Sequence, residues 1–112
     1  MAAIAVAITD KKQILGYAGY LEAENPAGGN IHTHATQATL DDGNMRVLFT
    51  SIDIGFPENA TTIKAAIVVP LLVRGDVVGT LKFYYRSVKR ISETQKSIAE
   101  GFGTLLSTKM AA

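Results

Sequence analysis

The sequence predicts an α+β fold, in which a central antiparallel sheet of about five strands carries helices packed on its faces. The main observation is a long apolar stretch over residues 63–86, interrupted at Arg74-Gly75-Asp76, a tripeptide typical of a tight turn. The second is that other apolar runs have the length and alternation of strands, whereas a clear helical spacing occurs only near the C-terminal end. Neighbouring antiparallel strands with few helices are typical of this class.

The central hairpin is predicted from residues 63–73 and 77–86. In the first segment both alternating faces are apolar, which predicts a strand covered on both sides. In the second, bulky apolar residues alternate with residues such as Thr80 and Lys82. We therefore expect two adjacent antiparallel strands on which the rest of the chain packs.

The remaining elements before this hairpin are short. They are strands over residues 3–8 and 14–21, a helix over residues 33–42, and a strand over residues 45–50. Alanine and glycine are frequent in the first two strands, so these strands either let a helix approach closely or leave space for a ligand. Gly43 is expected to end the helix in a left-handed conformation.

The C-terminal helix has a recognisable start, because Ser92 and Gln95 have the spacing of a capping box. Ile98, Phe102 and Leu105 form one apolar stripe, which we expect to face the sheet. A second stripe consists of Ala99, Gly103, Leu106 and Met110. One helix cannot bury both stripes against a single sheet. The second is therefore expected either to form a homodimer contact, with Gly103 letting two helices approach, or to cover the sheet edge in a monomer.

The composition of the chain limits the classes of function that it can have. A chain of 112 residues with 47% hydrophobic and 19% charged residues is expected to form one folded domain. The net charge of +1 argues against a nucleic-acid partner, and the absence of cysteine excludes disulfides and thiolate metal sites. No spaced pair of acids and no Ser-His-Asp pattern suggests catalysis. We expect no catalytic residue, no metal and no cofactor.

Three stretches carry a resemblance to a known family: IAVAITDKKQILGYAG near the start, IKAAIVVPLLVRGDVVGTLKFYY in the hairpin, and ISETQKSIAEGFGTLLST in the last helix. On these stretches the chain resembles the GAF sensory domains, which are related to PAS domains. More narrowly, it resembles the GAF domain of LytS-type bacterial sensor histidine kinases. The resemblance covers nearly the whole chain and implies a GAF-like fold.

The resemblance also implies a context. Residues 1–112 would be a single GAF-like sensory domain, excised from a longer membrane-bound kinase. The domain would lie in the cytoplasm, and the parent protein would lie in the bacterial inner or plasma membrane. Its partners would be the membrane and kinase regions of the parent chain and a second copy of itself through the C-terminal helix. The parent would phosphorylate a histidine and pass the phosphoryl group to a response regulator.

A ligand, if the domain has one, would by this resemblance lie between one sheet face and the middle helix. The polar candidates are Tyr17, Tyr20, His34, Arg46, Lys64 and Thr80. Lys64 interrupts an apolar strand, so it could pair with a carboxylate or phosphate, or its ammonium could extend into solvent. Two functions stay open: a sensor that binds a small molecule and relays the signal through its last helix, and a ligand-free dimerisation and signal-relay spacer.

Overall fold

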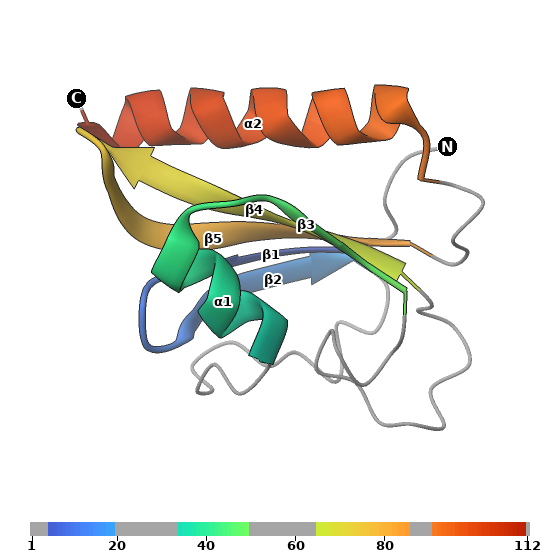
Figure 1. The fold of residues 1–112 in the computed structure, drawn as a ribbon, viewed down its shortest axis with the longest axis horizontal. Helices are drawn as coiled ribbons and strands as arrows, with labels where there is room; N and C mark the ends of the chain where they lie inside the picture. The colour runs from blue at the N-terminus through green and yellow to red at the C-terminus, as the bar shows by residue number, and fades with distance from the viewer. Residues whose placement is uncertain (1–4, 20–33, 50–64, 86–90, 112) are drawn as a thin grey trace.

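The computed structural model of the 112-residue chain describes residues 5–19, 34–49, 65–85 and 91–111. Within these residues the elements are β1 (Ala5–Thr9), β2 (Ile14–Gly19), α1 (His34–Asp42), β3 (Arg46–Leu48), β4 (Ala65–Val73), β5 (Asp76–Tyr85) and α2 (Glu93–Ala111). The described strands form one antiparallel sheet in the order β2-β1-β5-β4-β3 (Figure 1). The predicted α+β class is confirmed.

The central hairpin is confirmed, with its turn at Arg74 and Gly75. Both residues have positive φ angles, 53° and 85°. Two consecutive left-handed residues define a two-residue type I′ turn, whose twist matches that of antiparallel strands and which glycine accommodates easily. Val73 pairs with Asp76 directly across the turn, so β5 begins one residue before the predicted strand. Residues 63 and 64 of the predicted first strand lie outside the described residues.

The two helices cover opposite faces of the sheet (Figure 1). Alternate residues of β4 therefore pack on different helices: Ile67 and Leu71 belong to the core beneath α2, and Ala66 and Val68 lie on the side of α1. All four side chains are fully buried or nearly so. The prediction that this strand is covered on both sides is confirmed.

Helix α1 ends as predicted. Gly43 has a φ of 72°, and its N–H donates to the carbonyl oxygen of Thr39 at 2.8 Å. This left-handed residue satisfies one of the free carbonyls at the helix end. The chain then forms β3, which pairs with β4 at the edge of the sheet.

Helix α2 has the predicted N-cap but only half of the predicted capping box. The Ser92 hydroxyl accepts from the N–H of Gln95 at 3.3 Å. The Gln95 side chain, which we expected to reach back to Ser92, instead accepts from the Tyr85 hydroxyl at 3.4 Å. Because Tyr85 ends β5, this contact joins the start of the helix to the sheet.

The predicted orientation of α2 is wrong. Ala99 and Gly103 are its buried residues, and Leu106 packs against the core, whereas Phe102 is 53% exposed and Leu105 56% exposed. Of the second stripe, only Met110 is exposed. Gly103, Ala99 and Leu106 face the protein's own sheet and are not available for a dimer contact.

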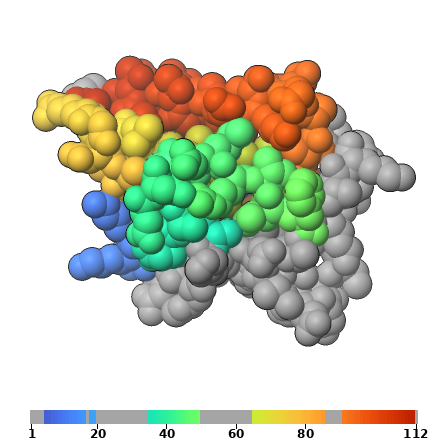
Figure 2. Space-filling model, viewed as in Figure 1, coloured from blue at the N-terminus to red at the C-terminus, as the bar shows by residue number. Residues whose placement is uncertain are grey.

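Close approach of the helix explains this reversal. A Cβ atom added at Gly103 would lie 2.5 Å from Cγ1 of Val69, far inside van der Waals contact. The surface of β4 beneath the helix is already filled by side chains such as Val69 and Leu71, so the face of α2 with small residues fits best. Figure 2 shows α2 packed as a continuous layer along one side of the molecule.

Candidate functional site

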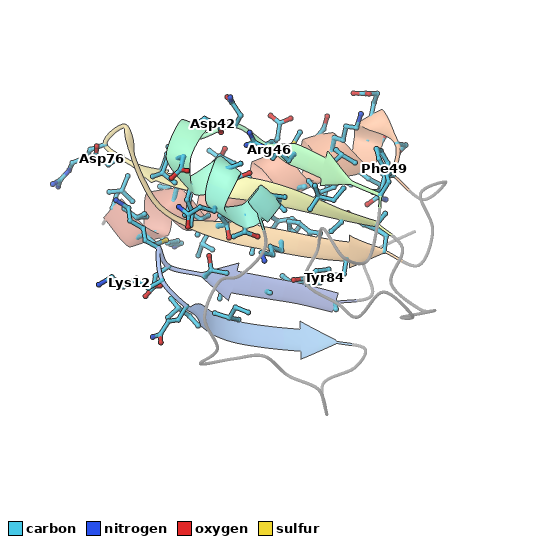
Figure 3. The ribbon with its side chains drawn as sticks, turned by 60° about the horizontal axis from the view of Figure 1, so that its bottom comes forward. Lys12, Asp42, Arg46, Phe49, Asp76 and Tyr84 are labelled. Atoms are coloured by element: carbon cyan, nitrogen blue, oxygen red, sulfur yellow. The ribbon has the colours of Figure 1, made fainter. Side chains whose placement is uncertain are left out.

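The face of the sheet beneath α1 carries the candidate site. One row of directly paired residues crosses this face from β2 to β3: Tyr17, Ala7, Lys82, Val68 and Arg46. Directly paired residues in an antiparallel sheet lie on the same face. The row brings Arg46 and the position of Tyr17 to opposite ends, with Lys82 at the centre on the middle strand β5. Figure 3 views this face, with α1 in front of the sheet and α2 behind it.

Lys82 is the residue that the sequence-based choice of candidates missed. Its side chain lies between Ala7 and Val68 in the row, and the residue is only 3% exposed. No ion pair or hydrogen bond joins Lys82 to another residue in the described part of the chain. Burial lowers the pKa of the Lys82 ammonium from its ordinary value to about 8, since removal from water disfavours the charged form.

A sequence signal for Lys82 did exist. It is a charged residue in the middle of a strand that is otherwise mostly apolar, the same reason for which Lys64 was chosen. What the sequence did not show is that β5 is the central strand, so that both neighbours of Lys82 are strands rather than solvent. Lys64 lies outside the described residues.

Thr80 lies on the same face, two residues from Lys82 along β5. Its hydroxyl shares a hydrogen bond of 2.7 Å with the hydroxyl of Thr9 on β1, and both residues are almost completely buried. This bond satisfies a polar group of each threonine inside the protein. The hydrogen bond of Thr80 joins β1 to β5. A role of Thr80 in ligand binding stays a prediction.

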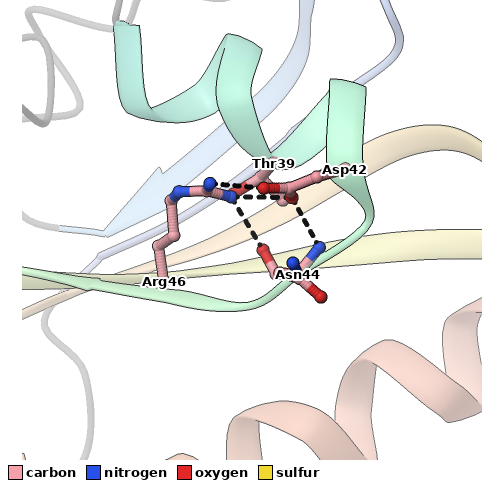
Figure 4. Close-up of polar contacts among 4 residues, drawn as sticks. All are labelled: Thr39, Asp42, Asn44 and Arg46. Carbon is pink, nitrogen blue, oxygen red and sulfur yellow. Dashed lines mark hydrogen bonds and ion pairs between the residues drawn. The ribbon is translucent and has the colours of Figure 1, made fainter.

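Arg46 is held by the end of α1 (Figure 4). Its guanidinium contacts both carboxylate oxygens of Asp42, at 2.5 and 2.9 Å, and also donates to the Thr39 hydroxyl at 3.2 Å and to the Asn44 carbonyl at 3.3 Å. The hydrogen bonds from Arg46, and secondarily from the Asn44 N–H, hold the pKa of Asp42 well below its usual range. Arg46 thus ties α1 to the edge strand, and its part in ligand binding stays a prediction.

The other candidates are less completely described. Tyr17 belongs to β2 and His34 is the first residue of α1, but their side chains lie outside the described part of the structure. Tyr20 also lies outside the described residues. The backbone register alone places Tyr17 opposite Ala7, one strand away from Lys82.

The opposite face is apolar and carries a groove beside α2. The groove has a volume of about 750 Å³. It is lined mainly by Val6, Leu81, Phe83, Tyr85, Ile98, Phe102, Leu105 and Leu106. Across it the rings of Phe83 and Phe102 lie 6.1 Å apart between centroids, a distance at which aromatic pairs attract. The groove exists because α2 packs over β4 and leaves the neighbouring β5 and β1 partly uncovered.

Comparison with solved structures defines the class of fold. The second GAF domain of DevS from Mycobacterium smegmatis superposes with a TM-score of 0.76 at 21% identity, covering 96% of this chain and 79% of that one. The fRMsr protein of Staphylococcus aureus, in complex with its substrate, gives 0.72 at 17% identity, covering 99% and 73%. The chain therefore has the fold of a GAF domain.

Sequence comparison leads further, although no protein-family model matches the chain. Over 106 residues, 95% of this chain, it is 34% identical to the sensor protein LytS of Staphylococcus saprophyticus. It is 31% identical over the same length to the sensor histidine kinase/phosphatase LytS of Staphylococcus aureus. The chain is thus similar to a segment of LytS-type sensor kinases, and the resemblance noted in the sequence is confirmed.

The chain covers only 18% of the length of these LytS relatives. Neither helix in the described part of the structure is long and apolar enough to cross a membrane.

Proposed function

We propose that this chain is the sensory domain of a two-component sensor histidine kinase of the LytS type. In this proposal a small molecule binds on the α1 face, and α2 relays the signal to the kinase region of the parent chain. The similarity to staphylococcal LytS proteins over 95% of the chain supports the context. The main support for a role of α2 in signal relay is its position. The helix is packed on the sheet along one side and exposes large apolar residues along another.

The α1 face supports ligand binding because its buried side chains are partly polar. Thr9, Thr80 and Lys82 are all buried there, while the core beneath α2 consists of apolar residues and Tyr85. Ligand sites in proteins combine an apolar lining with a few directed polar groups. Small residues on the same face, such as Ala7 and Ala66, reduce the side-chain volume around them.

Helix α2 is suited to carry a signal from the sheet. Gly103 contacts Val69, and the Ser107 hydroxyl accepts from the N–H of Leu72 at 3.1 Å, where β4 shifts its register. A change in the sheet would therefore reach the helix directly. A ligand biases such a relay only if it binds the two settings of the helix with different affinity.

The partner that we propose for the exposed stripe of α2 is a second copy of this chain. Ile98, Phe102 and Leu105 are each about half exposed and lie together beside the apolar groove. Large apolar residues gathered on one exposed helix face are typical of an interaction surface. The stripe from which the sequence predicted a homodimer contact contains Leu106, which faces the sheet. We therefore assign the contact to the exposed stripe.

Sedimentation velocity tests the relay surface. The wild-type chain is expected to sediment as a dimer and Phe102→Glu as a monomer with an unchanged circular dichroism spectrum, since a carboxylate cannot be buried in an apolar contact without a large penalty. Thr104→Glu is the matched control, because Thr104 is exposed on the other side of the same helix. A monomeric wild type, or a Phe102→Glu variant as dimeric as its parent, would contradict the proposal.

A second candidate function is a ligand-free spacer that dimerises and relays a signal from elsewhere. The apolar groove and the exposed stripe of α2 favour this spacer function, because a dimer formed through these surfaces would require no ligand. The two functions predict the same sedimentation result but differ on the α1 face, where only the sensor needs a binding site. In both, the domain itself is proposed to carry out no catalytic step and to lie in the cytoplasm, with the parent protein in the membrane.

A further inference from the structure

We propose that the molecule bound on the α1 face is an anion, and that its carboxylate or phosphate group contacts the ammonium of Lys82. This inference rests on the proposed sensory function and specifies the class of ligand. It also assigns a binding role to a residue that was not among the candidates from the sequence.

The position of Lys82 supports this role. It lies on the middle strand of the sheet, with β1 on one side and β4 on the other, so the side chain cannot reach solvent by passing a sheet edge. Its nearest cross-strand neighbours on the face are Ala7 and Val68, which offer no hydrogen-bond acceptor in their side chains. Helix α1 covers the same face.

The charge of Lys82 has no counter-charge in the described part of the structure. Of the α1 carboxylates, Asp42 is occupied by the guanidinium of Arg46, and Asp41 accepts from the side chain of Gln37 at 2.9 Å. Withdrawing an ammonium from most of its water without a counter-charge is unfavourable, and an anion placed beside it offsets part of that cost. Buried ionisable groups of this kind are characteristic of functional sites.

The surroundings limit what the anion can be. A single ammonium offers one positive charge and three hydrogen-bond donors, which suit one carboxylate or one phosphate group. The second cation in the row, Arg46, is already paired with Asp42. Beside Lys82 the face offers the methyl groups of Ala7 and Val68, so the rest of the ligand is expected to be small and partly apolar.

Lysine NMR on the 112-residue chain tests the inference. The side-chain signals of ¹³Cε-labelled lysines are followed at pH 7 during titration with sodium propionate, inorganic phosphate and neutral propionamide. The Lys82 signal is identified by its loss in Lys82→Met. We expect a saturable shift of this signal with propionate, phosphate or both, and none with propionamide. The relative affinity of the two anions then shows which anionic group the site prefers.

Variants separate binding at Lys82 from general attraction to a positive charge. Backbone amide shifts should show that Lys82→Met binds the anion at least about tenfold more weakly, the typical effect of losing a charge-assisted hydrogen bond. Lys82→Arg keeps a cation and should retain part of the affinity. Lys96→Met, on α2, is the control that should bind like the wild type, because Lys96 pairs with Glu93 at the surface.

The possible failures are distinguishable. Binding of propionamide as tight as that of propionate, or undiminished anion binding by Lys82→Met, would show that binding does not depend on a charge contact with Lys82. Either result would overturn the inference without contradicting the proposed sensory function. If none of the three compounds shifts the Lys82 signal in the millimolar range, the inference is also wrong. The relay would still be judged separately by the sedimentation of Phe102→Glu.

Discussion

The two faces of the sheet use the same strands for different purposes. Alternate residues of β5 illustrate this: Leu81 and Phe83 enter the apolar core beneath α2, and Thr80 and Lys82 are buried beneath α1. One face is thus a packing layer, and the other keeps polar groups at a cost in stability. This difference is what we expect if the α1 face binds a ligand as proposed, since buried polar groups stabilise less than apolar ones.

The two helices are also attached differently. Helix α2 lies directly on the sheet through Gly103, which brings backbone close to the side chain of Val69, and through the buried Ala99. The nine-residue helix α1 is anchored at its end by the partly exposed ion pair between Asp42 and Arg46. Exposed ion pairs contribute little to stability. We therefore expect α1 to be the more easily displaced cover of the two.

The largest effect is expected at the close contact beneath α2. Gly103→Leu should lower the free energy of unfolding by about 3 kcal/mol or more, because the new side chain overlaps Val69. Gly101→Leu is the matched control: no atom lies within 4 Å of an added Cβ there, so the change should raise stability by up to about 1 kcal/mol through helix propensity. Urea denaturation of both variants measures the difference. Similar effects at the two positions would show that α2 is not packed closely on the sheet.

The second effect concerns the polar face. Lys82→Met should raise the free energy of unfolding at pH 7, on the order of 1–3 kcal/mol, because it removes a buried charge without leaving a partner unpaired. The folded-state pKa of Lys82 is lowered to about 8, whereas that of the unfolded chain is about 10.4. Between these values the unfolded state binds more protons, so the wild type gains stability as the pH rises.

The advantage of Lys82→Met should therefore be constant below about pH 8 and should shrink between about pH 8 and 10.4. Thermal denaturation of both proteins from pH 6 to 10.5 measures this. If Lys82→Met is less stable than the wild type at pH 7, Lys82 has a stabilising partner in the free protein, and the contrast between the two faces would disappear.

The smallest effect is expected at the start of α2. Ser92→Ala should lower the free energy of unfolding by about 0.5–2 kcal/mol, because the Gln95 N–H loses its acceptor. Ser97→Ala, an exposed position inside the same helix, should be neutral or slightly stabilising. An unchanged denaturation midpoint for Ser92→Ala would show that the attachment of α2 depends on Gly103 and Ala99 and not on its cap.

Local patterns were sufficient for most of the fold. The turn at Gly75, the left-handed end of α1 at Gly43 and the cap at Ser92 depend on a few neighbouring residues, so they could be predicted from the sequence. The candidate site was less predictable. Thr80 and Arg46 do lie on one face of the sheet, but Lys82 was missed because its burial depends on which strands flank β5.

The sequence by itself determined that α2 has two apolar stripes and that the sheet has an alternating pattern. Only the tertiary structure decided which stripe faces the sheet. Hydrophobicity favoured the stripe with Phe102 and Leu105, but the surface of β4 is already filled by side chains such as Val69, so the smaller Ala99 and Gly103 fit closest. Close packing depends on the shapes of both surfaces, and these come together only in the folded chain.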